Sequence, residues 1–422
     1  MNAFTPAVRA SLLSDATKGA TLRKWSVRDL LRFNLTGSDD VNNITNVDVV
    51  ESLLREVQIR LAMQHSRLTS YANSIRARGS SSPSSSSSSR GRSNDEDIDS
   101  AMGHLRGLLR LHENTHLLTH RIVDGDHRQA LLGYKSRPGD RRYVIGIFDE
   151  IMSRHGSSVE TLADAVIQAR RSAVDDVRND EYDIEKFLHS RLVIQLLCDH
   201  CTSLHRGRPT GAISLGTDVS GLIDDASTEA RHVCDANLGI APGVIVRRDD
   251  EVESPPIVRP WLHHAIVEVT KNAMTSNVLA WRGHSPPSVS MDTMPPDVHI
   301  SFGTTDTISV GPTSSSPASN ADNSKYLRIR IMDAGTGIED IGRAFGFARS
   351  SSPVRWDRLH EQQSYAAVRQ PLGSLGVGLT LSRLMLRVFG GDLDVSNNDG
   401  IVGNGCTATL FINYDDTHVA DN

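Results

Sequence analysis

The hydrophobic pattern of the chain changes near Pro242. Before this residue, apolar side chains recur at the spacing of three to four residues that marks one face of a helix. After it, helical stretches alternate with stretches in which every second residue is apolar, as in strands. The change predicts a helical domain over residues 24–238 and an α/β domain over residues 243–416, in which helices cover one face of a largely antiparallel sheet.

The apolar spacing also places the individual elements. Two helices begin near Trp25 and Leu53, and further helices are predicted over residues 102–123, 144–151, 158–174, 187–204, 219–233, 261–280 and 375–389. Strands are predicted over residues 243–247, 298–302, 326–332, 392–396 and 407–414.

Several segments lack the apolar residues that a packed core needs. Residues 78–100 are Ser-rich and end in an acidic run, which predicts a disordered insertion. Residues 303–324 are predicted to form a long loop, and residues 417–422 a short tail. Residues 1–22 hold basic residues against a single acid, Asp15, a composition shared by organelle presequences and disordered tails.

Composition narrows the class of protein. The 422 residues carry 45 Lys and Arg against 51 Asp and Glu, so nucleic-acid binding is not expected. No apolar run approaches the roughly 18 to 20 residues of a membrane-spanning helix.

The four cysteines are too few to hold the fold by disulfides, which favours a reducing compartment. The C-x-x-C of Cys198 and Cys201 lacks a second ligand pair, so a structural role is favoured over zinc or redox chemistry.

The predicted helix over residues 261–280 carries an unusual polar face. His264, Glu268 and Asn272 are spaced four residues apart and therefore project from the same side. The opposite side is apolar and would contact the core. Taken alone, this pattern is more often an ordinary solvated face than a functional site.

Two glycine-containing motifs follow. Asp333-x-Gly335-x-Gly337 comes directly after a predicted strand, where a carboxylate could accept a hydrogen bond from a ligand amine, although a simple Asp-Gly turn explains it as well. Gly373-Ser374-Leu375-Gly376-Val377-Gly378-Leu379 opens a predicted helix, and free N–H groups at a helix N-terminus suit a phosphate. The second motif fits neither a dinucleotide-binding fingerprint nor a P-loop.

The order of these motifs, followed by Gly403-Asn-Gly405-Cys-Thr407 in the last hairpin, is more specific than any one of them. In this order the sequence resembles the ATP-binding fold of histidine kinases, gyrase-type ATPases and heat-shock chaperones. It resembles more closely the mitochondrial 2-oxo acid dehydrogenase kinases, which comprise the pyruvate and branched-chain types. The segments that carry this resemblance are residues 27–33, 55–62, 154–159, 187–192, 268–274, 382–383 and 389–393.

The resemblance implies a fold and a set of roles. The fold would be an amino-terminal four-helix-bundle-like domain followed by a histidine-kinase/gyrase-type ATP-binding α/β sandwich. Glu268 would be the general base, with His264 orienting it, and Asn272 would bind Mg²⁺. Asp333 would bind the adenine amine, and residues 339–374 would form a lid. The implied nucleotide-binding set is Lys271, Asn272, Thr275, Asp333, Gly335, Gly337, Ser350, Ser351, Ser374, Leu375, Gly376, Val377, Gly378, Leu379 and Thr407.

The same resemblance implies partners and a location. The protein would use ATP with Mg²⁺, and K⁺ as a further candidate ion, to phosphorylate serine on the decarboxylase component of a 2-oxo acid dehydrogenase complex and so inactivate it. It would dock on the lipoyl domain of the acyltransferase core, form a homodimer and reside in the mitochondrial matrix, with residues 1–22 as the presequence. Residues 205–242 slightly favour the branched-chain type.

Three positions depart from the family pattern. Thr275 replaces an Arg, Ser374 a Gly, and Cys406 a Thr. Thr cannot supply the charge or the forked donors of Arg, which puts turnover in doubt more than binding. A nucleotide-binding regulatory subunit without catalysis therefore stays open. A protein histidine kinase stays open too, although His116 and His155 lack the usual His-Glu context.

Overall fold

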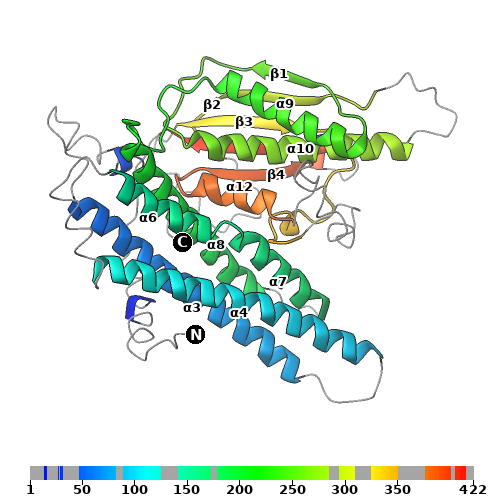
Figure 1. The fold of residues 1–422 in the computed structure, drawn as a ribbon. Coiled ribbons are helices and arrows are strands. Elements are labelled where there is room, and N and C mark those ends of the chain that lie inside the picture. The colour runs from blue at the N-terminus through cyan, green and yellow to red at the C-terminus, as the bar shows by residue number, and fades with distance from the viewer. Residues whose placement is uncertain are drawn as a thin grey trace. The chain divides into compact units, whose positions relative to one another are not determined.

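The computed structural model describes residues 14–16, 27, 29–31, 47–81, 89–124, 141–172, 178–284, 294–308, 325–349, 376–400 and 404–414. The chain divides into two compact units, Met1–Ala212 and Ile213–Asn422 (Figure 1). The first is helical, and the second combines helices with a five-stranded mixed sheet. Within the described ranges, no helix has both the length and the apolarity that crossing a bilayer would require.

The first unit is built from long amphipathic helices. These are α3 (Val47–Ser81), α4 (Ser89–Val123), α6 (Arg141–Arg154), α7 (Ser158–Ser172) and α8 (Arg178–His205). Helix α3 packs against α4 and α8, α4 packs against α7, and α6 packs against α8. Leu54, Leu105, Phe148, Leu162 and Leu188 are fully buried, so the apolar stripes that predicted these helices form the core between them.

Polar side chains also lie inside this unit. His112 Nε2 lies 2.8 Å from Gln64 Oε1, and its ring packs edge-on against that of His155 at 4.7 Å between centroids. Burial lowers the pKa of His112 to about 4, so the ring is neutral near pH 7. A neutral imidazole costs less to bury than a charged one, so the ring is tolerated in the core of this unit.

The helices extend into the segment expected to be disordered. Helix α3 continues to Ser81 and α4 begins at Ser89, so residues 78–81 and 89–100 of the expected insertion are helical. Residues 95–100 are exposed or half-buried. Elongation of an existing helix needs no new nucleus, so a helix anchored by packed turns continues through a polar sequence. Residues 82–88 lie outside the described part.

Part of the expected presequence or tail is folded. Ser14, Asp15 and Ala16 are helical, and Asp15 is only 4% exposed. Its Oδ2 accepts a hydrogen bond from Gln58 Nε2 at 2.7 Å and lies 3.0 Å from His116 Nε2. The expectation of a disordered tail therefore does not hold at residues 14–16, where the Asp15 carboxylate is a partner of buried polar groups.

In the described residues of the second unit, three α-helices accompany one sheet. Its helices are α9 (Val219–Leu238), α10 (Arg259–His284) and α12 (Gly378–Arg387), and its strands are β1 (Val244–Arg248), β2 (Val298–Thr305), β3 (Tyr326–Met332), β4 (Asp392–Asn397) and β5 (Cys406–Asn413). The strand order is β1-β2-β3-β5-β4. Among the strand pairs that the structure describes, β1 and β2 are parallel and the other three pairs are antiparallel, so the sheet is largely antiparallel, as predicted.

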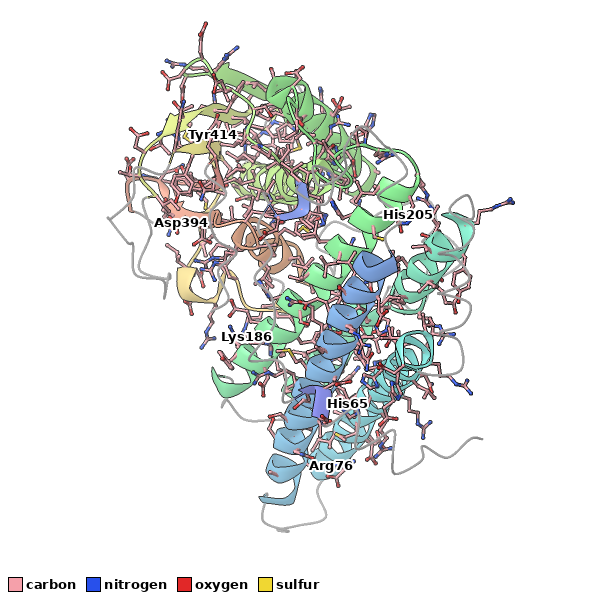
Figure 2. The ribbon with its side chains drawn as sticks, turned by 90° about the vertical axis from the view of Figure 1, so that its left-hand side faces the viewer. His65, Arg76, Lys186, His205, Asp394 and Tyr414 are labelled. Atoms are coloured by element: carbon pink, nitrogen blue, oxygen red, sulfur yellow. The ribbon has the colours of Figure 1, made fainter. Side chains whose placement is uncertain are left out.

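Helices cover one face of this sheet. Leu327, Ile329 and Ile331 of β3 are buried, whereas the residues between them are half-exposed, which is the pattern of a strand with one covered face. Helix α10 packs on β2 and β3, α12 packs on β4 and β5, and α9 packs on α10 (Figure 1). Asp394 of β4 and Tyr414, just beyond β5, are labelled on this unit in Figure 2.

The boundary between the units differs from the expected one. The apolar pattern assigned residues 219–233 to the helical domain, but α9 belongs to the second unit. Its Leu222, Ile223 and Ala226 lie in the same buried cluster as Ile266 of α10 and Ile300 of β2. The boundary therefore falls at Ala212 and Ile213, ahead of α9, because a helix belongs to the core that its apolar face contacts.

Candidate functional site

The polar face of α10 carries a buried ion pair. Lys271 Nζ donates a hydrogen bond to Glu268 Oε1 at 2.5 Å, and the two side chains are only 5% and 13% exposed. Asn272, the next residue, is exposed. The helix therefore presents a charged carboxylate that is held by an adjacent cation, beside an amide that is open to solvent.

His264 lies one turn before Glu268 on the same face. Burial lowers the pKa of His264 below its usual value, although the Glu268 charge acts in the opposite direction. Its Nε2 is buried and has no hydrogen-bond partner among the residues that the structure describes. The ring is therefore neutral near pH 7 and adds no second positive charge beside Lys271.

Thr275, which stands where the resembled family has an arginine, bonds to its own helix. Its Oγ1 donates to the Lys271 carbonyl oxygen at 2.8 Å. A hydroxyl that bonds to the preceding turn is turned back along the helix. Thr275 therefore does not replace the long cationic side chain.

The Asp333 carboxylate is held by backbone N–H groups. Its Oδ1 accepts hydrogen bonds from Gly335 N at 2.9 Å and from Cys406 N at 3.2 Å. Burial raises the pKa of Asp333, although these bonds and one from the Ser276 hydroxyl act in the opposite direction. A Cβ at Gly335 would overlap with Ser276, so a glycine is required where this loop meets α10.

The start of α12 meets the Glu268 carboxylate. A Cβ at Gly378, the first residue of α12, would overlap with Glu268 Oε2. Val377, which precedes the helix, makes no capping bond through its side chain, so the first-turn N–H groups at Gly378 and Leu379 are not capped from there. Gly376 has φ +64 and lies against the backbone of Arg349, which again requires a glycine.

The last hairpin adjoins the Asp333 loop. A Cβ at Gly405, which has φ +84, would overlap with the Asp333 carbonyl. Thr407 Oγ1 donates to Asn398 Oδ1 at 2.6 Å, and Asn398 Nδ2 donates to Asp333 O at 2.9 Å. The Asp333 loop and the start of α12 thus both contact α10, and the last hairpin contacts the Asp333 loop. Gly337 has φ +74, a conformation that favours glycine.

Several predicted site residues cannot be placed. Ser350, Ser351, Ser374 and Leu375 lie outside the described residues, as do Gly373 and Gly403. Of the expected lid over residues 339–374, the structure describes residues 339–349, including the short helix η3 (Ile341–Arg343). The Phe345 carbonyl accepts a bond from Thr380 Oγ1 at 2.9 Å, which ties this segment to α12.

Three further asparagines around the site, Asn277, Asn397 and Asn398, were not predicted from the sequence. Asn277 is fully buried, and its Oδ1 accepts a bond from Ala334 N at 2.7 Å. Asn397, the last residue of β4, bonds to the backbone at Ile338, and the next residue, Asn398, bonds to the backbone at Asp333. The one sequence signal for Asn277 is that a polar residue occupies a core position of the predicted helix. A buried amide in such a position indicates that hydrogen-bond partners surround it.

Asn272 offers an oxygen donor of a type that binds metal ions. Within the described part of the chain, no three His, Cys, Asp or Glu residues are grouped closely enough to hold an ion. A single exposed amide, Asn272, is the type of ligand that Mg²⁺ takes when substrate phosphates and water complete its shell. The cysteines are free and buried, and burial raises the pKa of Cys406 to about 12, so its thiol is unreactive.

Comparison with known proteins identifies relatives. No protein-family model matches the chain. It is 27% identical over 308 residues to pyruvate dehydrogenase (acetyl-transferring) kinase isozyme 1, mitochondrial, of Rattus norvegicus, and 28% identical over 310 residues to the Homo sapiens isozyme 1. Each match covers 67% of this chain and 62% of the relative. The mitochondrial pyruvate dehydrogenase kinase of Ascaris suum is 27% identical over 278 residues, which cover 62% of this chain and 60% of the relative.

Proposed function

We propose, given the relationship of the chain to the mitochondrial 2-oxo acid dehydrogenase kinases, that it is an ATP-dependent protein kinase. Its substrate would be a serine of the decarboxylase component of such a complex, which phosphorylation inactivates. The observation that carries this proposal is the contact of the Glu268 carboxylate with Gly378 at the start of α12. It brings a base next to backbone N–H groups that suit phosphates.

The fold supports the same proposal. The helical unit would be the four-helix-bundle-like domain that docks on the lipoyl domain of the acyltransferase core. The second unit would be the histidine-kinase/gyrase-type ATP-binding domain, in which helices cover one face of a mixed sheet. The open face of that sheet would serve the expected homodimer.

The proposed chemical step depends on alignment. Glu268 accepts the proton of the substrate serine as the serine oxygen bonds to the γ-phosphorus of ATP, and the bond from that phosphorus to the β-γ bridging oxygen breaks, releasing ADP. Phosphoryl transfer needs positioning and charge stabilisation more than a strong base. His264, neutral and one turn away, would orient Glu268.

The nucleotide would be bound by three elements. Asp333 would accept a hydrogen bond from the adenine amine beside the close approach at Gly335 and the turn at Gly337. Backbone N–H groups at 376–379 would bind the phosphates, and Lys271 would contact them as well. Mg²⁺, held by Asn272, would neutralise phosphate charge when bound, with K⁺ as a further candidate ion. Thr275 and Thr407, together with Ser350, Ser351, Ser374 and Leu375, would complete the set.

Location and substrate follow from the relatives. Their names place them in mitochondria, and we assign this protein to the mitochondrial matrix. The same names favour the pyruvate dehydrogenase complex, whereas residues 205–242 favour the branched-chain complex. Both substrates therefore belong in the test.

The test measures transfer of γ-phosphate from Mg-ATP to purified decarboxylase components of both types. We expect wild-type protein to label one of them on serine, and Glu268→Gln to abolish labelling while it retains ATP binding. Glu251→Gln, which changes an exposed glutamate outside the site, should label as well as wild type does. If ATP binds to wild-type protein but neither substrate is labelled, the kinase assignment is wrong.

That outcome would favour the second candidate, a nucleotide-binding regulatory subunit. The observation that supports it is Thr275, whose hydroxyl is bonded to its own helix. Thr275→Arg would then be expected to create transfer where the natural chain has none. The histidine-kinase alternative is not supported, because His116 and His155 are both buried within the helical unit.

A further inference from the structure

The backbone after β3 is fastened at both ends by asparagine side chains. Asn277 of α10 is 0% exposed; its Oδ1 accepts a hydrogen bond from Ala334 N at 2.7 Å, and its Nδ2 donates to Pro296 O at 2.8 Å. At the other end, Asn397 Oδ1 accepts from Ile338 N at 2.7 Å, and its Nδ2 donates to Ile338 O at 2.8 Å. Each side chain uses both its donor and its acceptor.

A third asparagine holds the residue that bears the carboxylate. Asn398 Nδ2 donates to the Asp333 carbonyl oxygen at 2.9 Å, and Asn398 Oδ1 accepts from Thr407 Oγ1 at 2.6 Å. The carboxylate itself accepts from Gly335 N and Cys406 N. Linked polar networks with all partners satisfied are rigid, because losing any member leaves a buried group unpaired.

We propose that Asn277, Asn397 and Asn398 form an asparagine clamp that positions Asp333 to select a 6-amino purine over a 6-oxo purine. This inference rests on the proposed function, since it needs Asp333 to face the nucleotide base. A carboxylate accepts a bond from the 6-amino group, whereas a 6-oxo group presents another acceptor and is repelled. The asparagines are positioning residues, because they act through the Asp333 loop.

Rigidity is what gives such a site its selectivity. An acceptor that is already in place loses little conformational freedom when the base binds. A loosened loop would have to be ordered by the ligand, and Asp333 could also turn away from a 6-oxo group. Loosening should therefore weaken ATP binding much more than ITP binding.

Two substitutions at Asn277 separate its two hydrogen bonds. Asn277→Ala removes both the acceptor for Ala334 N and the donor to Pro296 O. Asn277→Asp keeps an acceptor for Ala334 N, replaces the amide donor to Pro296 O, and places a carboxyl group at this buried position. If the bond to the loop after Asp333 matters, Asn277→Asp should retain more selectivity than Asn277→Ala.

The experiment measures dissociation constants for Mg-ATP and Mg-ITP by calorimetry on the full chain. We expect wild-type protein to bind ATP roughly ten- to a hundredfold more tightly than ITP, as expected for one hydrogen bond to a charged acceptor. In Asn277→Ala that ratio should fall by about tenfold, mainly through weaker ATP binding. Asn237→Ala is the control, because Asn237 is exposed on α9 and its Nδ2 donates a hydrogen bond to Val233 O of the same helix.

The outcomes distinguish the clamp from the function on which it rests. A folded Asn277→Ala protein with the wild-type ATP/ITP ratio would overturn the clamp and leave the proposed function intact. Wild-type protein that binds no ATP would overturn both. If Asn277→Ala does not fold, Asn397→Ala and Asn398→Ala are measured in the same way, and unchanged ratios in both would overturn the clamp.

Discussion

Lys271 Nζ lies 2.5 Å from Glu268 Oε1, one turn away on the same helix, with both side chains almost completely buried. The carboxylate proposed as the general base is thus paired with a cation in this structure. The ion pair holds Glu268 at the start of α12, where its other oxygen meets Gly378. Phosphates arriving at Lys271 would compete for that cation and release the carboxylate toward a substrate hydroxyl.

The first prediction concerns this ion pair. Lys271→Met keeps the apolar stem but leaves Glu268 as an unpaired buried charge, so the free energy of unfolding should fall by about 3 kcal/mol. Adding Glu268→Gln to Lys271→Met should recover part of that loss, with a coupling energy of about 1 kcal/mol or more. Denaturant unfolding of the wild type, the two single variants and the double variant measures this coupling energy. Strictly additive effects would show that the two side chains do not interact.

The second prediction concerns Gly378. Gly378→Ala places a methyl group against Glu268 Oε2 and must displace the carboxylate. Because a shift of about 1 Å in a reacting group can cost roughly a hundredfold in rate, phosphoryl transfer should fall by about that factor while the protein stays folded. Gly283→Ala is the matched control, since nothing lies within 4 Å of a Cβ there. If Gly378→Ala transfers phosphate at the wild-type rate, Glu268 is not the general base.

The third prediction concerns pH. Burial alone would raise the pKa of Asp392, but hydrogen bonds from Arg383 and Arg387 outweigh it and hold that pKa below its usual value. A lowered folded-state pKa stabilises the protein above the unfolded-state pKa of about 4, and this stabilisation is lost as pH falls through the folded-state pKa. The stability difference between wild type and Asp392→Asn should therefore be largest near neutral pH and shrink below about pH 4.

Chemical unfolding at several pH values between neutral and acidic measures that difference. Asp340→Asn is the control, because Asp340 pairs with Arg343 in an exposed position, where ion pairs contribute little. A difference between wild type and Asp392→Asn that does not change with pH would mean that the arginines stabilise Asp392 by packing rather than by charge.

The local sequence pattern was sufficient to predict a helix or strand where one face of that element is buried. Strand β3 has the predicted bounds, because the alternation of Leu327, Ile329 and Ile331 follows directly from its covered face. Helix α9 was also predicted, but its place in the second unit was not. Its contacts with α10 are made across the chain, and an apolar stripe does not specify which core it will enter.

The same distinction applies to the site. His264 and Glu268 could be grouped from their spacing on a single helix. The bond from Ala334 N to Asn277 joins residues 57 positions apart, and no periodic pattern reports a contact of that kind. The composition around Asp15 likewise gave no sign of its contact with His116, because the two residues lie 101 positions apart.

The last prediction concerns Asp15. Asp15→Ala removes an acceptor shared by Gln58 and His116, both of which are buried, so the free energy of unfolding should fall by about 1–3 kcal/mol. Asp99→Ala is the control, because Asp99 is exposed on α4. Denaturant unfolding measures the change. A chain that begins at residue 23 should lose at least as much stability, because it lacks the same carboxylate. If both variants are as stable as wild type, residues 14–16 are dispensable to the helical unit.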